Sequence, residues 1–119
     1  MILESVGIGG DPDADEFGDE GSDTLGHIAE WFLENEGRAL ALPNLARLGM
    51  GEAYRLVHGK LPAGWKKVET VGFFAAASEV STGKDTPSGH WEMAGVPATW
   101  DWGCLPKVDE RALRHISEP

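Results

Sequence analysis

The sequence predicts an α/β fold in which helices flank a parallel sheet. Three observations support this fold class: a strand-like apolar start, an amphipathic helix over residues 23–35, and a second strand-like segment around Val71–Ala76. The chain has 119 residues, which is the length of one small domain. Because it contains only two strand-like segments, the predicted sheet is a truncated one.

The first ten residues predict the end of a strand that runs into a glycine-rich loop. Met1, Ile2 and Leu3 are apolar, and three of the residues from 7 to 10 are glycine. Glu4 lies at the carboxyl end of this predicted strand, where open α/β sheets place ligand-binding side chains. From its position alone, a solvent-exposed carboxylate is the simpler interpretation of Glu4.

The clearest predicted helix covers residues 23–35. Five apolar residues fall on one helical face: Leu25, Ile28, Ala29, Phe32 and Leu33. Ser22 or Asp23 can cap the start of this helix, and Gly37 can end it.

Two further segments follow before the predicted second strand. Pro43 predicts the opening of a short helix that Gly49 ends, and residues 52–58 predict a further helical turn. The second strand is predicted around Val71–Ala76, because Val71, Phe73 and Phe74 suit a pleated, covered surface.

The segment 81–102 places a hydroxyl group at a predicted helix start. Pro87 suits the first helical position, so Thr86 is the predicted N-cap of a helix over Pro87–Ala94, which Gly95 closes. A helix N-terminus attracts phosphate through its N–H groups and dipole, and Lys84 adds a positive charge upstream. An ordinary capped helix is the simpler interpretation of the spacing alone.

Composition limits the classes of partner. Twenty acidic residues against ten basic ones give a formal net charge of -10, which disfavours binding to nucleic acid or to anionic membranes. The single cysteine, Cys104, excludes an internal disulfide and indicates a reducing compartment. No secretory signal or membrane-spanning apolar run is evident, so we predict a cytoplasmic location.

Several segments together resemble bacterial phosphopentomutases over roughly residues 2–102. Ser81-Thr-Gly-Lys-Asp-Thr-Pro-Ser-Gly-His-Trp-Glu-Met-Ala-Gly-Val resembles the active-site segment of this family. Four segments resemble the family's N-terminal part in the same order: Leu3-Glu-Ser-Val-Gly-Ile-Gly, Pro12-Asp-Ala, Phe17-Gly-Asp-Glu-Gly-Ser-Asp-Thr-Leu-Gly-His-Ile-Ala-Glu30 and Leu42-Pro-Asn-Leu.

The resemblance implies an alkaline-phosphatase-like α/β core with a separate cap domain. It implies interconversion of ribose 1-phosphate and ribose 5-phosphate, or of the deoxyribose pair, with a sugar bisphosphate activator at a site with two Mn²⁺ ions. The threonine of the Gly-Lys-Asp-Thr motif, here Thr86, would carry the phosphoryl group and contact metal, and Glu4 would be a metal ligand. Residues 1–102 would form the N-terminal part of the catalytic core and residues 103–119 a divergent tail.

Two departures from the family pattern bear on activity. The family has aspartate where this chain has Glu4, and the extra methylene moves the carboxylate by about 1 Å, against coordination tolerances of roughly 0.2 Å. Family members are several times longer, and their remaining Asp and His ligands lie in the C-terminal part. We therefore expect the separate chain to be inactive. Two alternatives stay open: a phosphate-ester hydrolase or another mutase of the same superfamily, and a non-catalytic remnant or small acidic interaction domain.

Overall fold

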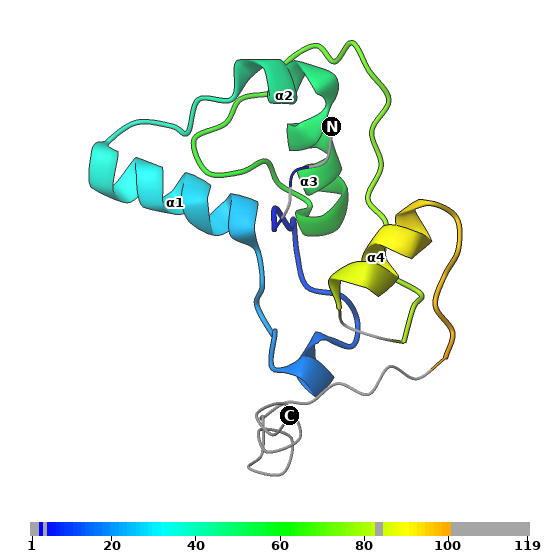
Figure 1. Ribbon diagram of the computed structural model, residues 1–119. Helices are drawn as coiled ribbons and strands as arrows, with labels where there is room; N and C mark the ends of the chain where they lie inside the picture. The colour runs from blue at the N-terminus through cyan, green and yellow to red at the C-terminus, as the bar shows by residue number, and fades with distance from the viewer. Residues whose placement is uncertain (1–2, 4, 83–84, 101–119) are drawn as a thin grey trace, which may run out of the picture. The chain divides into compact units, whose positions relative to one another are not determined.

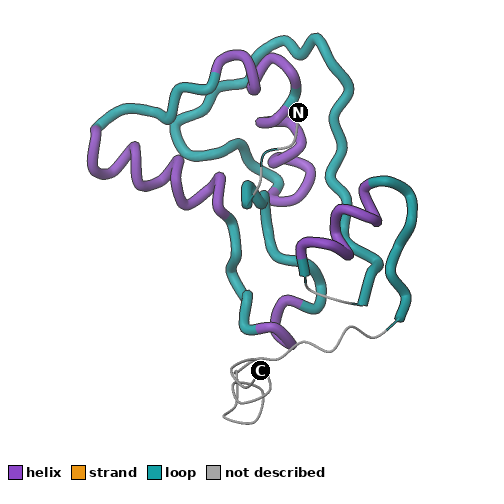
Figure 2. The backbone as a smooth tube through the Cα atoms, viewed as in Figure 1, coloured by secondary structure: helices purple, strands orange, loops and turns teal. Residues whose placement is uncertain are grey.

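The computed structural model describes residues 3, 5–82 and 85–100 (Figure 1). Within these residues the chain forms four α-helices, a short 3-10 helix over Ala14–Phe17, and no strand, as Figure 2 shows. The chain divides into two compact units, Met1–Ser78 and Glu79–Pro119. None of the helices in the described ranges is long and apolar enough to cross a membrane.

Helix α1 (Thr24–Glu36) confirms the helix predicted over residues 23–35. Asp23 fixes its start, because Asp23 Oδ1 accepts a hydrogen bond from the backbone N–H of Gly26 at 3.0 Å. Gly37 ends the helix in a left-handed conformation with a φ of 62°. Local chemistry at both ends therefore accounts for the bounds of α1.

Helices α2 (Pro43–Leu48) and α3 (Met50–His58) pack against each other in the first unit. Pro43 begins α2 and Gly49 ends it, as predicted, whereas α3 is longer than the turn predicted there. Gly49 has a φ of 108°, and a Cβ at this residue would lie 2.8 Å from the Cβ of Phe74. Both the backbone conformation and the close approach of Phe74 thus require glycine between the two helices.

The strand predicted around Val71–Ala76 is wrong. These residues are exposed and irregular, and Phe73 is fully exposed. The N–H of Val71 donates to the carbonyl of Arg47, in α2, at 2.9 Å instead of joining a ladder. A strand is stabilised by hydrogen bonds to a neighbouring strand, and the described residues supply no such neighbour. Residues 3 and 5–10 are also irregular, so the predicted parallel sheet is absent from the described part of the chain.

Hydrophobic burial is limited in both units. Among the described residues, eighteen large apolar side chains are exposed. The buried apolar residues are Ala14, Leu25, Ala29, Tyr54 and Ala98, of which only Leu25 and Tyr54 are large. Polar contacts therefore carry a larger share of the stability than they do in a well-covered domain.

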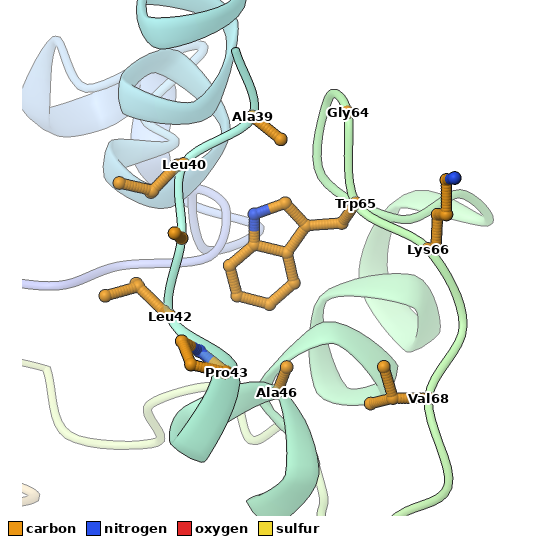
Figure 3. A pocket seen from close by; sticks show the side chains of 10 residues that line it. Ala39, Leu40, Leu42, Pro43, Ala46, Gly64, Trp65, Lys66 and Val68 are labelled. Atoms are coloured by element: carbon orange, nitrogen blue, oxygen red, sulfur yellow. The ribbon is translucent and has the colours of Figure 1, made fainter.

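An apolar pocket of about 270 Å³ lies in the first unit, between the segment that enters α2 and residues 64–68. Figure 3 shows the Trp65 indole projecting into this space toward the residue 39–43 segment. The indole Nε1 is buried and has no hydrogen-bond partner among the described residues. No carboxylate lines the pocket, so it offers nothing that would hold a divalent cation.

Candidate functional site

Thr86 is the first residue of α4 (Thr86–Met93) in the second unit, and it is exposed. The N-cap is Asp85 and not Thr86, which corrects the predicted position by one residue. Asp85 Oδ1 accepts from the backbone N–H of Ser88 at 2.9 Å, and the fully buried Ser88 Oγ donates to the Asp85 carbonyl at 3.0 Å. A carboxylate is the stronger acceptor, so Asp85 takes the cap and the Thr86 hydroxyl is not used for capping.

The surroundings of Thr86 combine opposite electrostatic effects. The amino end of α4 favours a negative group, because its N–H groups and dipole point toward that end. The Asp85 carboxylate places a negative charge in the same turn. His90 Nδ1 lies 2.8 Å from the carbonyl oxygen of Thr86, and it donates to that oxygen, which can only accept. A phosphoryl group on Thr86 therefore needs a cation close by, and Lys84, the predicted cation, lies outside the described residues.

A second set of hydrogen bonds fixes the chain that leads to Thr86. The Glu92 carboxylate accepts from the Val80 N–H at 2.8 Å, from the Ser81 N–H at 2.7 Å and from the Ser81 hydroxyl at 2.5 Å. Ser81 Oγ in turn accepts from the N–H of Ala98 at 3.0 Å. The hydrogen bond from the Ser81 hydroxyl and those from the backbone lower the pKa of Glu92, so Glu92 is ionised at neutral pH.

The predicted metal ligands are not brought together in the described residues. Glu4 lies outside them, and Thr86 is at the start of α4. Residues 3, 5–82 and 85–100 contain no group of three or more His, Cys, Asp or Glu side chains that could hold a metal ion. The described residues alone therefore do not fit a dinuclear metal centre.

A polar cluster that the sequence reasoning missed holds the glycine-rich loop after Glu4. The Tyr54 hydroxyl donates to Asp23 Oδ2 at 2.6 Å, and the Tyr54 and His58 rings stack with centroids 4.1 Å apart. His58 Nε2 donates to the carbonyl of Ile8 at 2.7 Å and lies 3.6 Å from Asp23 Oδ2. The spacing of Tyr54 and His58 by one helical turn is the only signal in the sequence that could have linked them.

The cluster raises the pKa of Tyr54, and a further hydrogen bond ties the loop to α1. Burial first, and then the hydrogen bond to Asp23, raise the pKa of Tyr54 above its ordinary value. The N–H of Leu25 donates to the carbonyl of Gly7 at 3.1 Å, which ties the same loop to the start of α1. A pocket of about 370 Å³ opens beside the loop, lined by residues 6–11, Val57 and residues 76–78. The loop after Glu4 is thus anchored from α1 and α3.

Phosphopentomutases from several bacteria are similar to this chain. The chain is 55% identical over 103 residues to a phosphopentomutase of Idiomarina loihiensis, covering 87% of this chain and 26% of the relative. It is 56% identical over 115 residues to a phosphopentomutase of Sodalis glossinidius, and 54% identical over 115 residues to one of Yersinia enterocolitica. Each of these two matches covers 92% of this chain and 28% of the relative.

No family model and no solved structure matches the chain. The chain spans about a quarter of the length of the curated relatives it matches. Over nine-tenths of its own residues, however, more than half are identical to phosphopentomutases from several bacteria. Over about nine-tenths of its length, the chain is therefore similar to an N-terminal portion of the phosphopentomutases.

Proposed function

We propose that the protein to which this chain belongs is a phosphopentomutase that interconverts (deoxy)ribose 1-phosphate and (deoxy)ribose 5-phosphate. The observation that carries the proposal is the identity above 50% to phosphopentomutases across almost the whole chain, including the segment around Thr86. The proposal includes an alkaline-phosphatase-like α/β core, with residues 1–102 as its N-terminal part and residues 103–119 as a divergent tail. It also includes a cytoplasmic location.

In the proposed reaction Thr86 carries the phosphoryl group. The bond between Thr86 Oγ1 and phosphorus breaks as the phosphoryl group passes to the C5 hydroxyl of ribose 1-phosphate, or to the C1 hydroxyl of ribose 5-phosphate, which gives the 1,5-bisphosphate. The proton of that hydroxyl passes to Thr86 Oγ1. The other phosphoryl group of that bisphosphate then returns to Thr86, and the isomeric monophosphate leaves. A sugar bisphosphate activator fits this scheme because it can supply the first phosphoryl group to an unmodified Thr86. The exposed first-turn position of Thr86 supports the assignment.

The proposal includes two Mn²⁺ ions, with Glu4 and Thr86 as contacts in this chain. Two Mn²⁺ ions would supply positive charge to the transferring phosphoryl group, which Asp85 would otherwise repel. Since the described residues hold no group of three ligands, the other ligands are expected from the rest of the protein.

A fusion protein tests the proposed function. In this fusion, residues 1–102 of the chain replace the matched part of the Idiomarina loihiensis phosphopentomutase. With Mn²⁺ and a sugar bisphosphate, the fusion should convert ribose 1-phosphate into ribose 5-phosphate, whereas the 119-residue chain alone should give no product. Release of inorganic phosphate without isomerised sugar would favour the hydrolase alternative. Failure of a folded, helical fusion where the parent enzyme turns over would contradict the proposal.

Substitution of Glu4 by aspartate tests the departure from the family pattern. In the fusion, Glu4→Asp should lower the Mn²⁺ concentration that gives half-maximal activity by about tenfold. The shorter side chain brings the carboxylate back by about 1 Å, and metal–ligand distances tolerate a change of only roughly 0.2 Å. A Mn²⁺ titration of initial rates measures the change. Glu34→Asp, at an exposed position on α1, is the matched control. An equal response of both variants would show that Glu4 is not a metal ligand.

A further inference from the structure

We infer that Glu92 and Ser81 are positioning residues for Thr86: they lock the chain segment that leads into the Gly-Lys-Asp-Thr motif against the helix that begins with Thr86. This inference rests on the proposed role of Thr86 as phosphoryl carrier. It concerns residues whose side chains make their contacts within the second unit.

Helix α4 makes hydrogen bonds on both sides of Gly83 and Lys84 in the sequence. At the downstream end, Asp85 and Ser88 exchange hydrogen bonds across the first turn of α4. At the upstream end, Glu92, from the last turn of α4, accepts three hydrogen bonds from Val80 and Ser81. Ser81 and Asp85 are four positions apart in the sequence, so both anchored points lie close to Thr86 along the chain.

Residues 98–100 hold the upstream anchor, Ser81 and Thr82, by further hydrogen bonds. The N–H of Ala98 donates to Ser81 Oγ at 3.0 Å, in a buried contact, and the Thr82 N–H donates to the Ala98 carbonyl at 3.1 Å. Thr82 Oγ1 donates to the carbonyl of Trp100 at 3.1 Å. Residues 81 and 82 are therefore held between Glu92 and residues 98–100.

The hydrogen bonds between Ser81 and Glu92 are strong ones. Ser81 is only 8% exposed, so its hydroxyl and N–H have limited access to water as an alternative partner. Hydrogen bonds to an ionised carboxylate are shorter and stronger than those between neutral groups. Removing that carboxylate would loosen the upstream anchor without touching Thr86. A displacement of a reacting group by about 1 Å can lower a rate by about 100-fold.

The experiment compares Glu92→Gln, Ser81→Ala and the double variant in the fusion. Glutamine keeps the length of the side chain, but its NH₂ group cannot accept a hydrogen bond. Both single variants should lower kcat by about 10- to 100-fold and change KM for ribose 1-phosphate by less than about twofold. The loss in the double variant should be smaller than the product of the two single losses, because the two residues share the hydrogen bond between Ser81 Oγ and Glu92. Glu34→Gln, an exposed glutamate on α1, is the matched control and should leave kcat unchanged.

A second readout uses the 119-residue chain itself. Its ¹⁵N spectrum should show shifted amide resonances for Val80 and Ser81 in Glu92→Gln, with the resonances of α1 in place. Unchanged kcat in both single variants, or unshifted Val80 and Ser81 amides, would overturn the inference. A fall in kcat/KM that comes entirely from KM would also overturn it. Failure of the proposed function is distinguishable, because the unsubstituted fusion would then form no ribose 5-phosphate, whereas failure of this inference alone leaves that fusion active.

Discussion

Replacing Thr86 with alanine in the fusion is expected to lower kcat by about a thousandfold or more. Without the hydroxyl oxygen, no phosphoryl group can be held on the enzyme between the two half-reactions, and substitution of a covalent nucleophile has effects of this size or larger. Helix α4 should survive the change, because its cap is formed by Asp85 and Ser88. Initial rates of ribose 5-phosphate formation measure the loss.

Two further variants make the Thr86 experiment specific. Thr86→Ser keeps a hydroxyl at the same place and should retain activity within about tenfold of the unsubstituted fusion. Thr70→Ala, in the first unit, is the matched control and should leave kcat unchanged. Mass spectrometry after incubation with a sugar bisphosphate should place the phosphate on the peptide that contains Thr86. Phosphate on another residue, or full activity in Thr86→Ala, would remove Thr86 from the proposed mechanism.

The sequence predicted those helices whose ends are set by local chemistry. Asp23 and Gly37 bound α1, and Pro43 and Gly49 bound α2, because a cap or a left-handed residue acts on its own few neighbours. The one-residue error at α4 has the same local origin. Thr86 before Pro87 is a reasonable N-cap, but the preceding carboxylate of Asp85 accepts from Ser88 more strongly than a hydroxyl would.

The sequence failed where structure depends on distant parts of the chain. Val71–Ala76 has the composition of a strand, yet a strand forms only beside a partner, and the described residues provide none. The contacts of Glu92 with Val80 and Ser81, and of Tyr54 with Asp23, join residues that no spacing rule connects. The roles of Thr86 and Glu4 came from family resemblance and stay predictions.

Replacing Asp23 with alanine is expected to destabilise the 119-residue chain by about 3 kcal/mol. The change removes the N-cap of α1, which costs about 1 kcal/mol, and leaves the buried Tyr54 hydroxyl without its acceptor, which costs roughly 1–3 kcal/mol. Tyr54 is only 2% exposed, so water is a poor replacement for the lost carboxylate. Urea unfolding followed by helical circular dichroism measures the difference. Asp13→Ala, at an exposed position without a side-chain capping bond, should change stability little.

The same contact gives the chain a measurable response to alkali. Tyr54 is the single tyrosine, so the absorbance of tyrosinate reports on this residue alone. Its pKa is raised in the folded chain, first by burial and then by Asp23, whereas an unfolded tyrosine ionises near its ordinary value of about 10. The unfolded state therefore loses its proton first, and stability should fall as the pH rises above about 10.

Asp23→Asn separates the charge of Asp23 from its hydrogen bond to Tyr54. The amide oxygen can still accept one hydrogen bond, but the negative charge that disfavours tyrosinate is gone. The Tyr54 titration in this variant should move to lower pH than in the unsubstituted chain, and the stability should lie between those of the unsubstituted chain and Asp23→Ala. Two results together would contradict this role of the cluster: an unchanged Tyr54 titration in Asp23→Asn, and equal stabilities of Asp23→Ala and Asp13→Ala. The cluster would then not hold α1, α3 and the loop after Glu4 together.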